Sequence, residues 1–166
     1  MPLRHTAPRA LLALVATAAL LPARADAKDL RKRFGLGFNS YLDESAGLAA
    51  RYVVPSGDEA LNIVVEGNVG FSTISLSERF AAGGRLLTSV VAEDNMNFYV
   101  GGGLGYVSGD AGDALRIQPL ASVDFFMFGL ENLGFTSSFG VNIDVGGGRG
   151  GLSTASQASA GLTYWF

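Results

Sequence analysis

Along most of the chain, hydrophobic and polar residues alternate with a period of two. Near the carboxyl end, for example, Phe135 and Phe139 fall on one face of such a segment, whereas Thr136 and Ser138 fall on the other. This period is typical of a β-strand with one face turned away from water, because helical side chains repeat about every 3.6 residues. Short stretches rich in Gly, Pro, Asn and acidic residues separate the segments and predict turns. The predicted strands span residues 33–42, 47–54, 60–73, 80–92, 96–107, 115–128, 133–145 and 152–166.

The amino-terminal residues follow a different pattern. Arg4, His5 and Arg9 form a basic start, and residues 10–21 form an apolar core that ends at Pro22. A core of about twelve residues is too short to cross ~30 Å of hydrocarbon as a helix, which argues against a retained membrane anchor. The pattern is typical of a secretory signal peptide.

Small residues at alternate positions offer two cleavage sites, after Ala25 or after Ala27, and we favour Ala27. The sequence therefore predicts a signal peptide over residues 1–27 and one domain over residues 28–166. The removed residues include three arginines and one aspartate, so the mature chain keeps 9 basic and 14 acidic residues, a net charge of −5. Nucleic-acid binding is not expected for such a chain.

The inventory of reactive side chains is small. The chain has no cysteine, which excludes disulfides and thiolate metal sites, and its one histidine, His5, lies in the predicted signal peptide. The mature chain therefore lacks an imidazole base for a Ser-His or Asp-His mechanism. The loop with Asp110 and Asp113 lacks the spacing and the closing Glu of an EF-hand, and no helix follows the glycine clusters. No catalytic residue, cofactor or metal site is predicted.

Alternation alone also fits a soluble antiparallel sheet with one buried face. In the predicted strands, however, the apolar faces carry no charged residue, as a surface in contact with lipid requires. The opposite faces mix Gly, Ser, Thr and Asn with a few charges, which suits a narrow polar lumen. Amphipathic aromatic rings lie towards strand ends, where membrane barrels form girdles at the lipid–water interface. The residues expected to form this girdle are Tyr41, Tyr52, Tyr106, Tyr164 and Trp165.

The last strand carries the most specific signal. Ala158, Ala160, Leu162, Tyr164 and Phe166 form one apolar face that ends on an aromatic residue at the end of the chain. This pattern resembles the C-terminal strand signal of bacterial outer-membrane barrels. The mature chain resembles, over nearly its whole length, the small eight-stranded barrels of the OmpA and OmpX type.

The resemblance implies an all-β fold, an eight-stranded antiparallel up-and-down transmembrane β-barrel. It further implies insertion by the outer-membrane assembly machinery, for which Leu162, Tyr164 and Phe166 would be the signal, with both termini in the periplasm. The turns at 55–59, 93–95 and 129–132 would then face the periplasm. The connections at 43–46, 74–79, 108–114 and 146–151 would face outward, and they are short for this family, which argues against an adhesin-like role.

The inward faces predict a charge network. Counted from the turns, Arg51 lies opposite Glu66, and Glu66 lies opposite Arg85. Arg116 and Asp144 are placed similarly, and Asp124 points inward. An eight-stranded barrel has room only for side chains, so these charges are expected to pair and plug the lumen; a gate or ion path is the alternative.

Pro119 conflicts with a regular sixth strand because it cannot donate a ladder hydrogen bond. We expect a bulge near Pro119, or pairing that begins only after it. For the whole chain we expect a monomeric integral outer-membrane protein, in contact with lipid, with a structural or envelope-integrity role. A soluble exported carrier like the lipocalins, with its apolar face inward, and a narrow channel are the alternatives.

Overall fold

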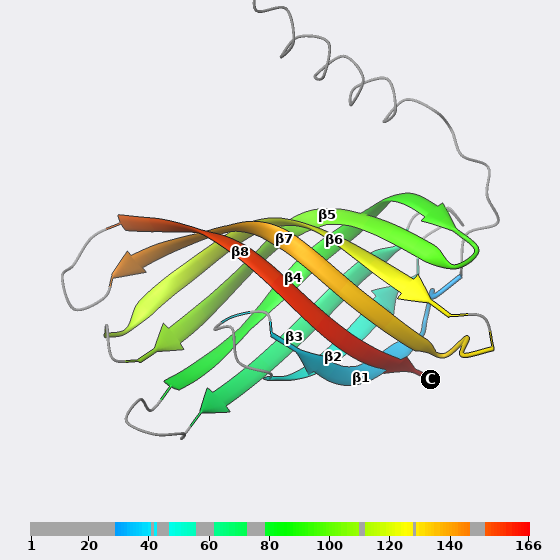
Figure 1. Ribbon diagram of the computed structural model, residues 1–166, viewed down its shortest axis with the longest axis horizontal. Helices are drawn as coiled ribbons and strands as arrows, with labels where there is room; N and C mark the ends of the chain where they lie inside the picture. The colour runs from blue at the N-terminus through cyan, green and yellow to red at the C-terminus, as the bar shows by residue number, and fades with distance from the viewer. Residues whose placement is uncertain are drawn as a thin grey trace, which may run out of the picture.

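The computed structural model describes residues 29–40, 42, 47–55, 62–72, 79–109, 112–127, 129–146 and 152–166. It is a closed barrel in which all eight predicted strands are present (Figure 1). The predicted signal peptide, residues 1–27, lies outside the described residues. The strands are β1 (Phe34–Asn39), β2 (Gly47–Val54), β3 (Ile63–Ser72), β4 (Arg79–Glu93), β5 (Met96–Ser108), β6 (Ala114–Phe126), β7 (Leu133–Gly146) and β8 (Leu152–Trp165).

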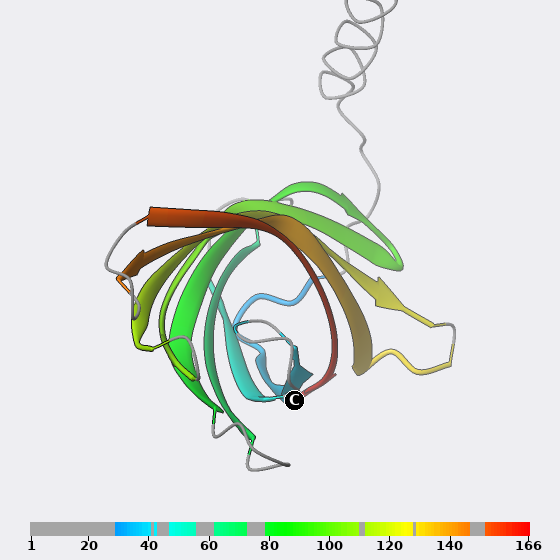
Figure 2. The same ribbon diagram turned by 60° about the vertical axis from the view of Figure 1, so that its left-hand side comes forward.

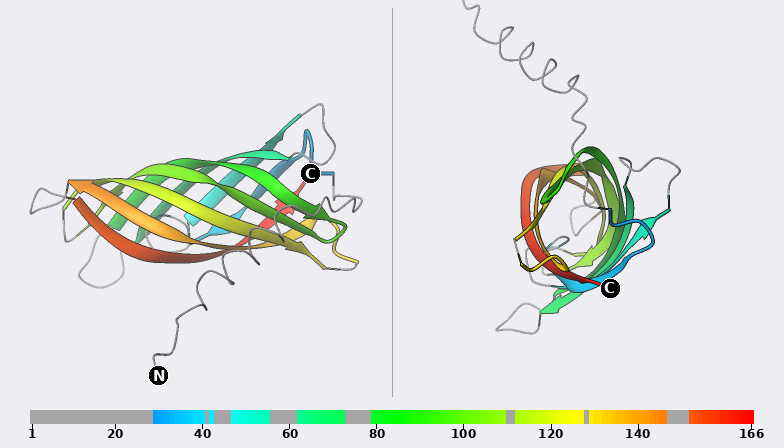
Figure 3. Two further views of the ribbon diagram at one scale, coloured as in Figure 1. Left: turned by 90° about the horizontal axis from the view of Figure 1, so that it is seen from above. Right: turned by 90° about the vertical axis from the view of Figure 1, so that its right-hand side faces the viewer.

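Each strand pairs antiparallel with the next one in the chain, and β8 pairs with β1 to close the ring (Figures 2 and 3). Short connections impose this up-and-down order. Between β4 and β5, for example, Glu93 pairs with Met96, so only Asp94 and Asn95 make the turn. The fold class predicted from the sequence, an all-β eight-stranded antiparallel barrel, is confirmed.

The period of two decides which side chains face the lumen. On β7, Phe135 and Phe139 are 39% and 55% exposed, whereas Thr136 and Ser138 between them are 5% and 1% exposed. The other strands follow the same rule, so large apolar side chains cover the outside of the wall. Polar and charged side chains fill much of the inside.

The first strand is shorter than predicted. Apolar alternation through Leu36 and Phe38 suggested a strand over residues 33–42, but β1 ends at Asn39. Leu42 lies in a turn and is 2% exposed, because the chain leaves the wall and enters the barrel interior. A Cβ atom at Gly105 would lie 2.5 Å from Leu42 Cδ2, so the glycine makes room for this leucine.

The bulge or late start of pairing that we expected near Pro119 is not present. The pairing of β6 with β7 runs on both sides of Pro119 in one register, from Ile117 with Ile143 to Leu120 with Gly140, without a bulge. Only the rungs at residues 118 and 119 are missing, as a proline without an N–H requires. Pro119 still lies opposite Gly102 of β5. Among the described residues, the pairing shifts in register in β4, between Ser89 and Val91.

Candidate functional site

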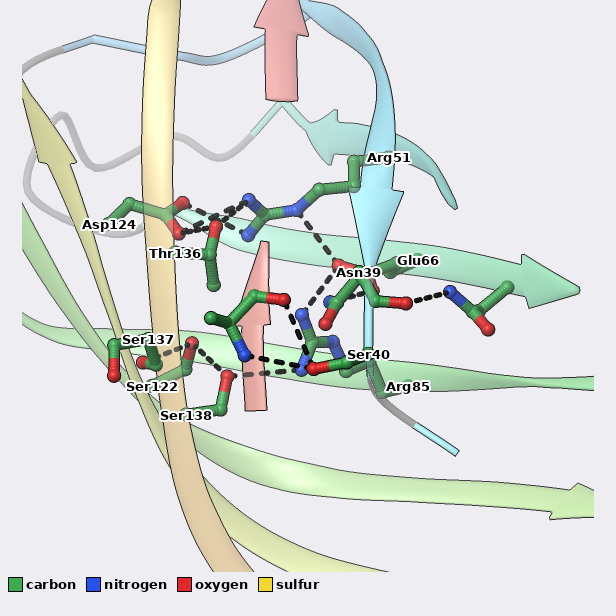
Figure 4. A network of polar contacts seen from close by, with 12 residues as sticks. Asn39, Ser40, Arg51, Glu66, Arg85, Ser122, Asp124, Thr136, Ser137 and Ser138 are labelled. Carbon is green, nitrogen blue, oxygen red and sulfur yellow. Dashed lines mark hydrogen bonds and ion pairs between the residues drawn. The ribbon is translucent and has the colours of Figure 1, made fainter. Parts of the chain in front are cut away.

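Four charged side chains meet inside the barrel and form the lumen cluster: Arg51, Glu66, Arg85 and Asp124 (Figure 4). Arg51 Nε lies 3.0 Å from Glu66 Oε2, and Arg85 Nη2 lies 2.9 Å from the same oxygen. Both pairs join directly opposed residues of neighbouring strands, as the turn positions predicted. The third ion pair crosses the lumen, with Arg51 Nη2 3.0 Å from Asp124 Oδ2. These side chains are at most 1% exposed.

Hydroxyl and amide groups complete the lumen cluster. Asn39 Nδ2 donates to Glu66 Oε1 at 3.0 Å, and Thr136 Oγ1 donates to Asp124 Oδ1 at 2.7 Å. Arg85 Nη1 donates to Ser138 Oγ at 3.2 Å. Two positive and two negative charges are thus neutralised, since a buried charge without a partner would be costly. The sequence did not predict that Asn39, Thr136 and Ser138 belong to this cluster, although the alternation places all three on inward faces.

Trp165 corrects the predicted aromatic girdle. It is 0% exposed and lies inside the barrel, where the Arg51 guanidinium carbon is 5.1 Å from the centroid of its ring. This geometry is a cation–π contact. The reason is the strand period: on β8, residue 165 must face the opposite way from its neighbours Tyr164 and Phe166.

The rest of the predicted girdle faces outward where the structure describes it. Tyr52, Tyr106 and Tyr164 are exposed on the outer surface, and Tyr41 lies outside the described residues. The three residues of the expected assembly signal, Leu162, Tyr164 and Phe166, share this outer face. The rings of Tyr164 and Phe166 meet edge to face, with their centroids 5.1 Å apart.

A further ion pair, separate from the lumen cluster, lies nearer one end of the lumen. Arg116 Nε is 2.6 Å from Asp144 Oδ1, and Arg116 also donates to the backbone oxygen of Leu42. The two charged side chains are 16% and 22% exposed, so water reaches this pair. The predicted partnership of Arg116 with Asp144 is therefore present, but apart from the lumen cluster.

At the other end of the lumen, buried apolar side chains lie beside the buried polar residues Asn62, Ser89 and Asn97. The buried apolar cluster of the barrel includes Leu30, Val53, Val64, Leu87, Tyr99, Phe126 and Trp165, and it extends to Leu42, Ala81 and Leu120. Leu30 reaches it from a turn ahead of β1, in which Arg33 N donates to Leu30 O and Lys32 N donates to Val53 O. Along the described part of the lumen, apolar side chains with a few polar ones are followed by the lumen cluster, and then by Leu42 with the pair of Arg116 and Asp144.

The chemistry of these groups is that of a structural core. Glu66 and Asp124 are the buried carboxylates of the lumen cluster, and both accept hydrogen bonds and face arginines, so neither is poised as a general base. Within the described ranges, no group of three or more His, Cys, Asp or Glu residues is placed to hold a metal ion. In the same ranges, no helix is long and apolar enough to cross a membrane. No protein-family model and no curated protein matches the chain.

Proposed function

We propose that this chain is an integral outer-membrane β-barrel protein with a structural or envelope-integrity role. In this proposal the signal peptide over residues 1–27 is removed, and residues 28–166 insert with both termini in the periplasm. The observation that carries the proposal is the orientation of the wall, whose large apolar side chains face outward while its buried charges face inward. Apolar side chains are stable in contact with lipid hydrocarbon, whereas hydrocarbon cannot solvate charged side chains.

The orientation favours this function over a soluble lipocalin-like carrier. A carrier needs an apolar cavity inside and polar side chains outside. Here the interior instead holds the lumen cluster, and side chains such as Phe71 and Phe139 are 71% and 55% exposed on the outside. An apolar surface of this extent would promote aggregation in water.

The contents of the lumen favour a plug over a channel. All three ion pairs of the lumen cluster are short, and two of them use the same oxygen of Glu66. Leu30 and Leu42 are buried on the two sides of this charged layer. The proposed protein is therefore a closed monomeric barrel without a catalytic role or cofactor, and its partners are lipid and, during insertion, the assembly machinery that reads Leu162, Tyr164 and Phe166.

Electrophoresis of the membrane fraction, with and without boiling, tests the proposal. A folded outer-membrane barrel resists SDS, so we expect an unboiled band that shifts on heating and that is absent from the soluble periplasmic fraction. A mature protein found only in the soluble periplasm would overturn the proposal. Amino-terminal sequencing of the same band decides whether cleavage follows Ala25 or Ala27.

A further inference from the structure

Two buried asparagines of the lumen have side chains without hydrogen-bond partners. Asn62, directly before β3, and Asn97 of β5 are both 0% exposed. Among the described residues, neither the amide nitrogen nor the amide oxygen of either side chain has a hydrogen-bond partner. A buried amide without a partner is costly, and buried polar groups in proteins are therefore bonded to protein or to ordered water. The described protein groups do not supply such a partner for these two amides.

A third polar group lies beside them. The side chain of Tyr99 is also 0% exposed, and its hydroxyl group has no hydrogen-bond partner within the same part of the chain. Tyr99 and Asn97 are near enough to interact, but their polar atoms do not form a regular hydrogen bond with each other. We call the side chains of Asn62, Asn97 and Tyr99 the amide site.

Strand pairing brings the three side chains of the amide site to one part of the lumen. Ser89 of β4 lies between them. Its N donates to Asn62 O at 2.9 Å, and its Oγ accepts a hydrogen bond from Asn62 N at 2.7 Å. On its other side, Ser89 lies opposite Tyr99 of β5. Asn97 precedes Tyr99 by two residues, so it shares the inward face of that strand.

The shift of register in β4 coincides with the amide site. It falls between Ser89 and Val91, so Val90 is the extra residue, and its side chain is 53% exposed on the outside. An extra residue changes the direction of the side chains around it, and such irregularities are frequent beside functional sites. The wall therefore departs from a regular ladder at the height where the unpartnered amides lie.

The chemistry of the amide site defines the ligand that it can bind. Two amides and a hydroxyl group offer both donors and acceptors, and they carry no charge. The charges of the lumen cluster already compensate one another, so a charged ligand would be left without a counter-charge. Leu30 and Trp165, which are also 0% exposed, belong to the same buried cluster as Tyr99 and separate this region from solvent. A ligand must therefore be small, neutral and able both to donate and to accept hydrogen bonds, and water meets these conditions.

We propose that the amide site binds ordered water, with at least one molecule that bridges the amides of Asn62 and Asn97 and the hydroxyl group of Tyr99. A bridging water is enthalpically nearly as favourable as a direct hydrogen bond. Asn97 lies opposite Asp124 of β6, so the bound water extends the polar network of the lumen cluster towards the end that Leu30 closes. The site lies inside the barrel, so this inference goes beyond the proposed function and applies to the protein in lipid and in detergent alike.

NMR of the refolded barrel in detergent tests the amide site directly. The side-chain amide protons of Asn62 and Asn97 should show rotating-frame cross-relaxation with water, whose sign is opposite to that of chemical exchange. Asn97→Leu removes one ligand of the water, because leucine is close to asparagine in size but has no polar side-chain atom. This variant should abolish the water cross-peaks of Asn62.

Asn142→Leu is the matched control. Asn142 is an inward asparagine of β7, where its Oδ1 accepts a hydrogen bond from Gln118 Nε2 at 2.5 Å. It lies nearer the pair of Arg116 and Asp144, so its replacement should leave the water cross-peaks of Asn62 and Asn97 unchanged.

Urea unfolding gives a second measurement, in which the two cases have opposite signs. If the site binds water, Asn62→Leu and Asn97→Leu each lower the midpoint. The double variant then loses less than the sum of the two, because both substitutions act on one site. If the amides are simply unpaired, each leucine raises the midpoint instead, since it removes a costly buried polar group.

Three results overturn the proposal. These are a folded wild-type barrel without water cross-peaks at the two asparagines, leucine variants with raised midpoints, and cross-peaks of Asn62 that survive in Asn97→Leu. All three are measured on a barrel folded in detergent, so they leave the proposed membrane location to the electrophoresis test. The wild-type spectrum decides the question even if a leucine variant does not fold.

Discussion

The inner and outer faces of this wall are built from neighbouring residues yet have opposite chemistry. Arg85 and Leu86 are consecutive in β4. The Arg85 side chain is 0% exposed and contacts Glu66 inside, whereas Leu86 is 56% exposed outside. In a water-soluble barrel the two residue types would be exchanged. The comparison shows that polar side chains occupy buried positions here and apolar side chains exposed ones, which is the arrangement that the proposed membrane location requires.

A comparison of ion pairs along the molecule refines this point. The same types of side chain form a pair in the lumen cluster, a pair between Arg116 and Asp144, and a pair between Asp29 and Arg31 at the start of the described chain. The carboxylate side chains of the three sites are 0%, 22% and 53% exposed. Because water and salt weaken charge interactions, the free energy that each pair contributes should fall in this order.

The largest effect is expected for Glu66→Ala. The substitution removes the carboxylate that both Arg51 and Arg85 contact, at 3.0 Å and 2.9 Å. Breaking a buried ion pair typically costs ~3 to 5 kcal/mol, since a charge is left without compensation. Urea unfolding of the refolded barrel should show a loss of this size in the free energy of unfolding.

Glu131→Ala is the matched control, because Glu131 is exposed in the turn before β7. Its urea midpoint should stay close to wild type, within about 0.5 kcal/mol. A Glu66→Ala midpoint equal to that of Glu131→Ala would mean that the lumen cluster contributes nothing to stability.

The next effect tests the outer face. Leu86→Arg places a charge on the outside of β4, next to the buried Arg85. An arginine facing the middle of a bilayer costs ~2 to 4 kcal/mol, and one near the interface costs ~0 to 1 kcal/mol. Unfolding from lipid vesicles should show the larger loss for Leu86→Arg and the smaller loss for Leu130→Arg, which changes an exposed residue of the turn between β6 and β7. Two small and equal losses would argue that the outer face does not contact lipid.

How far the sequence predicts this site depends on the range of each contact. The pairs of Glu66 with Arg51 and with Arg85 follow from turn positions and from a period of two, which are local properties. The pair of Arg51 with Asp124 joins β2 to β6 across the lumen, 73 residues apart. This pair depends on how the strands tilt and stagger when the barrel closes. That geometry cannot be predicted from the turn positions and the period of two in a single sequence.

Two predictions from local sequence patterns are wrong, the outward position of Trp165 and the end of the first strand at residue 42. Trp165 was assigned to the girdle because of its residue type, although the alternation that places Tyr164 outside already placed Trp165 inside. The end of β1 was missed for the opposite reason. The alternation continues formally to Leu42, but Leu42 packs against Gly105, where a Cβ atom would leave no room for it, and this contact depends on the packing of distant strands. Where residue type and period conflict in a barrel, the period should be given the greater weight.

A smaller effect is expected for Asp144→Asn. The variant keeps the size of the side chain but removes the charge that lies 2.6 Å from Arg116 Nε. Arg116 keeps its hydrogen bond to Leu42, and water can solvate the guanidinium group, so we expect a loss of about 1.5 kcal/mol, at the low end of hydrogen bonds to charged groups. Urea unfolding should place this midpoint between those of Glu66→Ala and wild type. A loss as large as that of Glu66→Ala would show that this end of the lumen is as dry as its centre.

The smallest effect is expected for Asp29→Asn, at the exposed end of the series. Arg31 Nη2 lies 2.8 Å from Asp29 Oδ2, and its hydrogen bonds lower the pKa of Asp29 from 3.8 to about 2. A carboxylate whose pKa is lowered on folding stabilises the folded state above its unfolded pKa, and this contribution is lost as the pH falls from 3.8 towards 2. Exposed pairs contribute only ~0 to 1 kcal/mol, so the variant should lie within that range of wild type at pH 7. Urea midpoints of the two proteins should then converge near pH 2, and at pH 7 in high salt, because protonation and screening each remove the same interaction. A difference that persists in acid or in high salt would show that Asp29 acts through packing of the turn that carries Leu30 rather than through its charge.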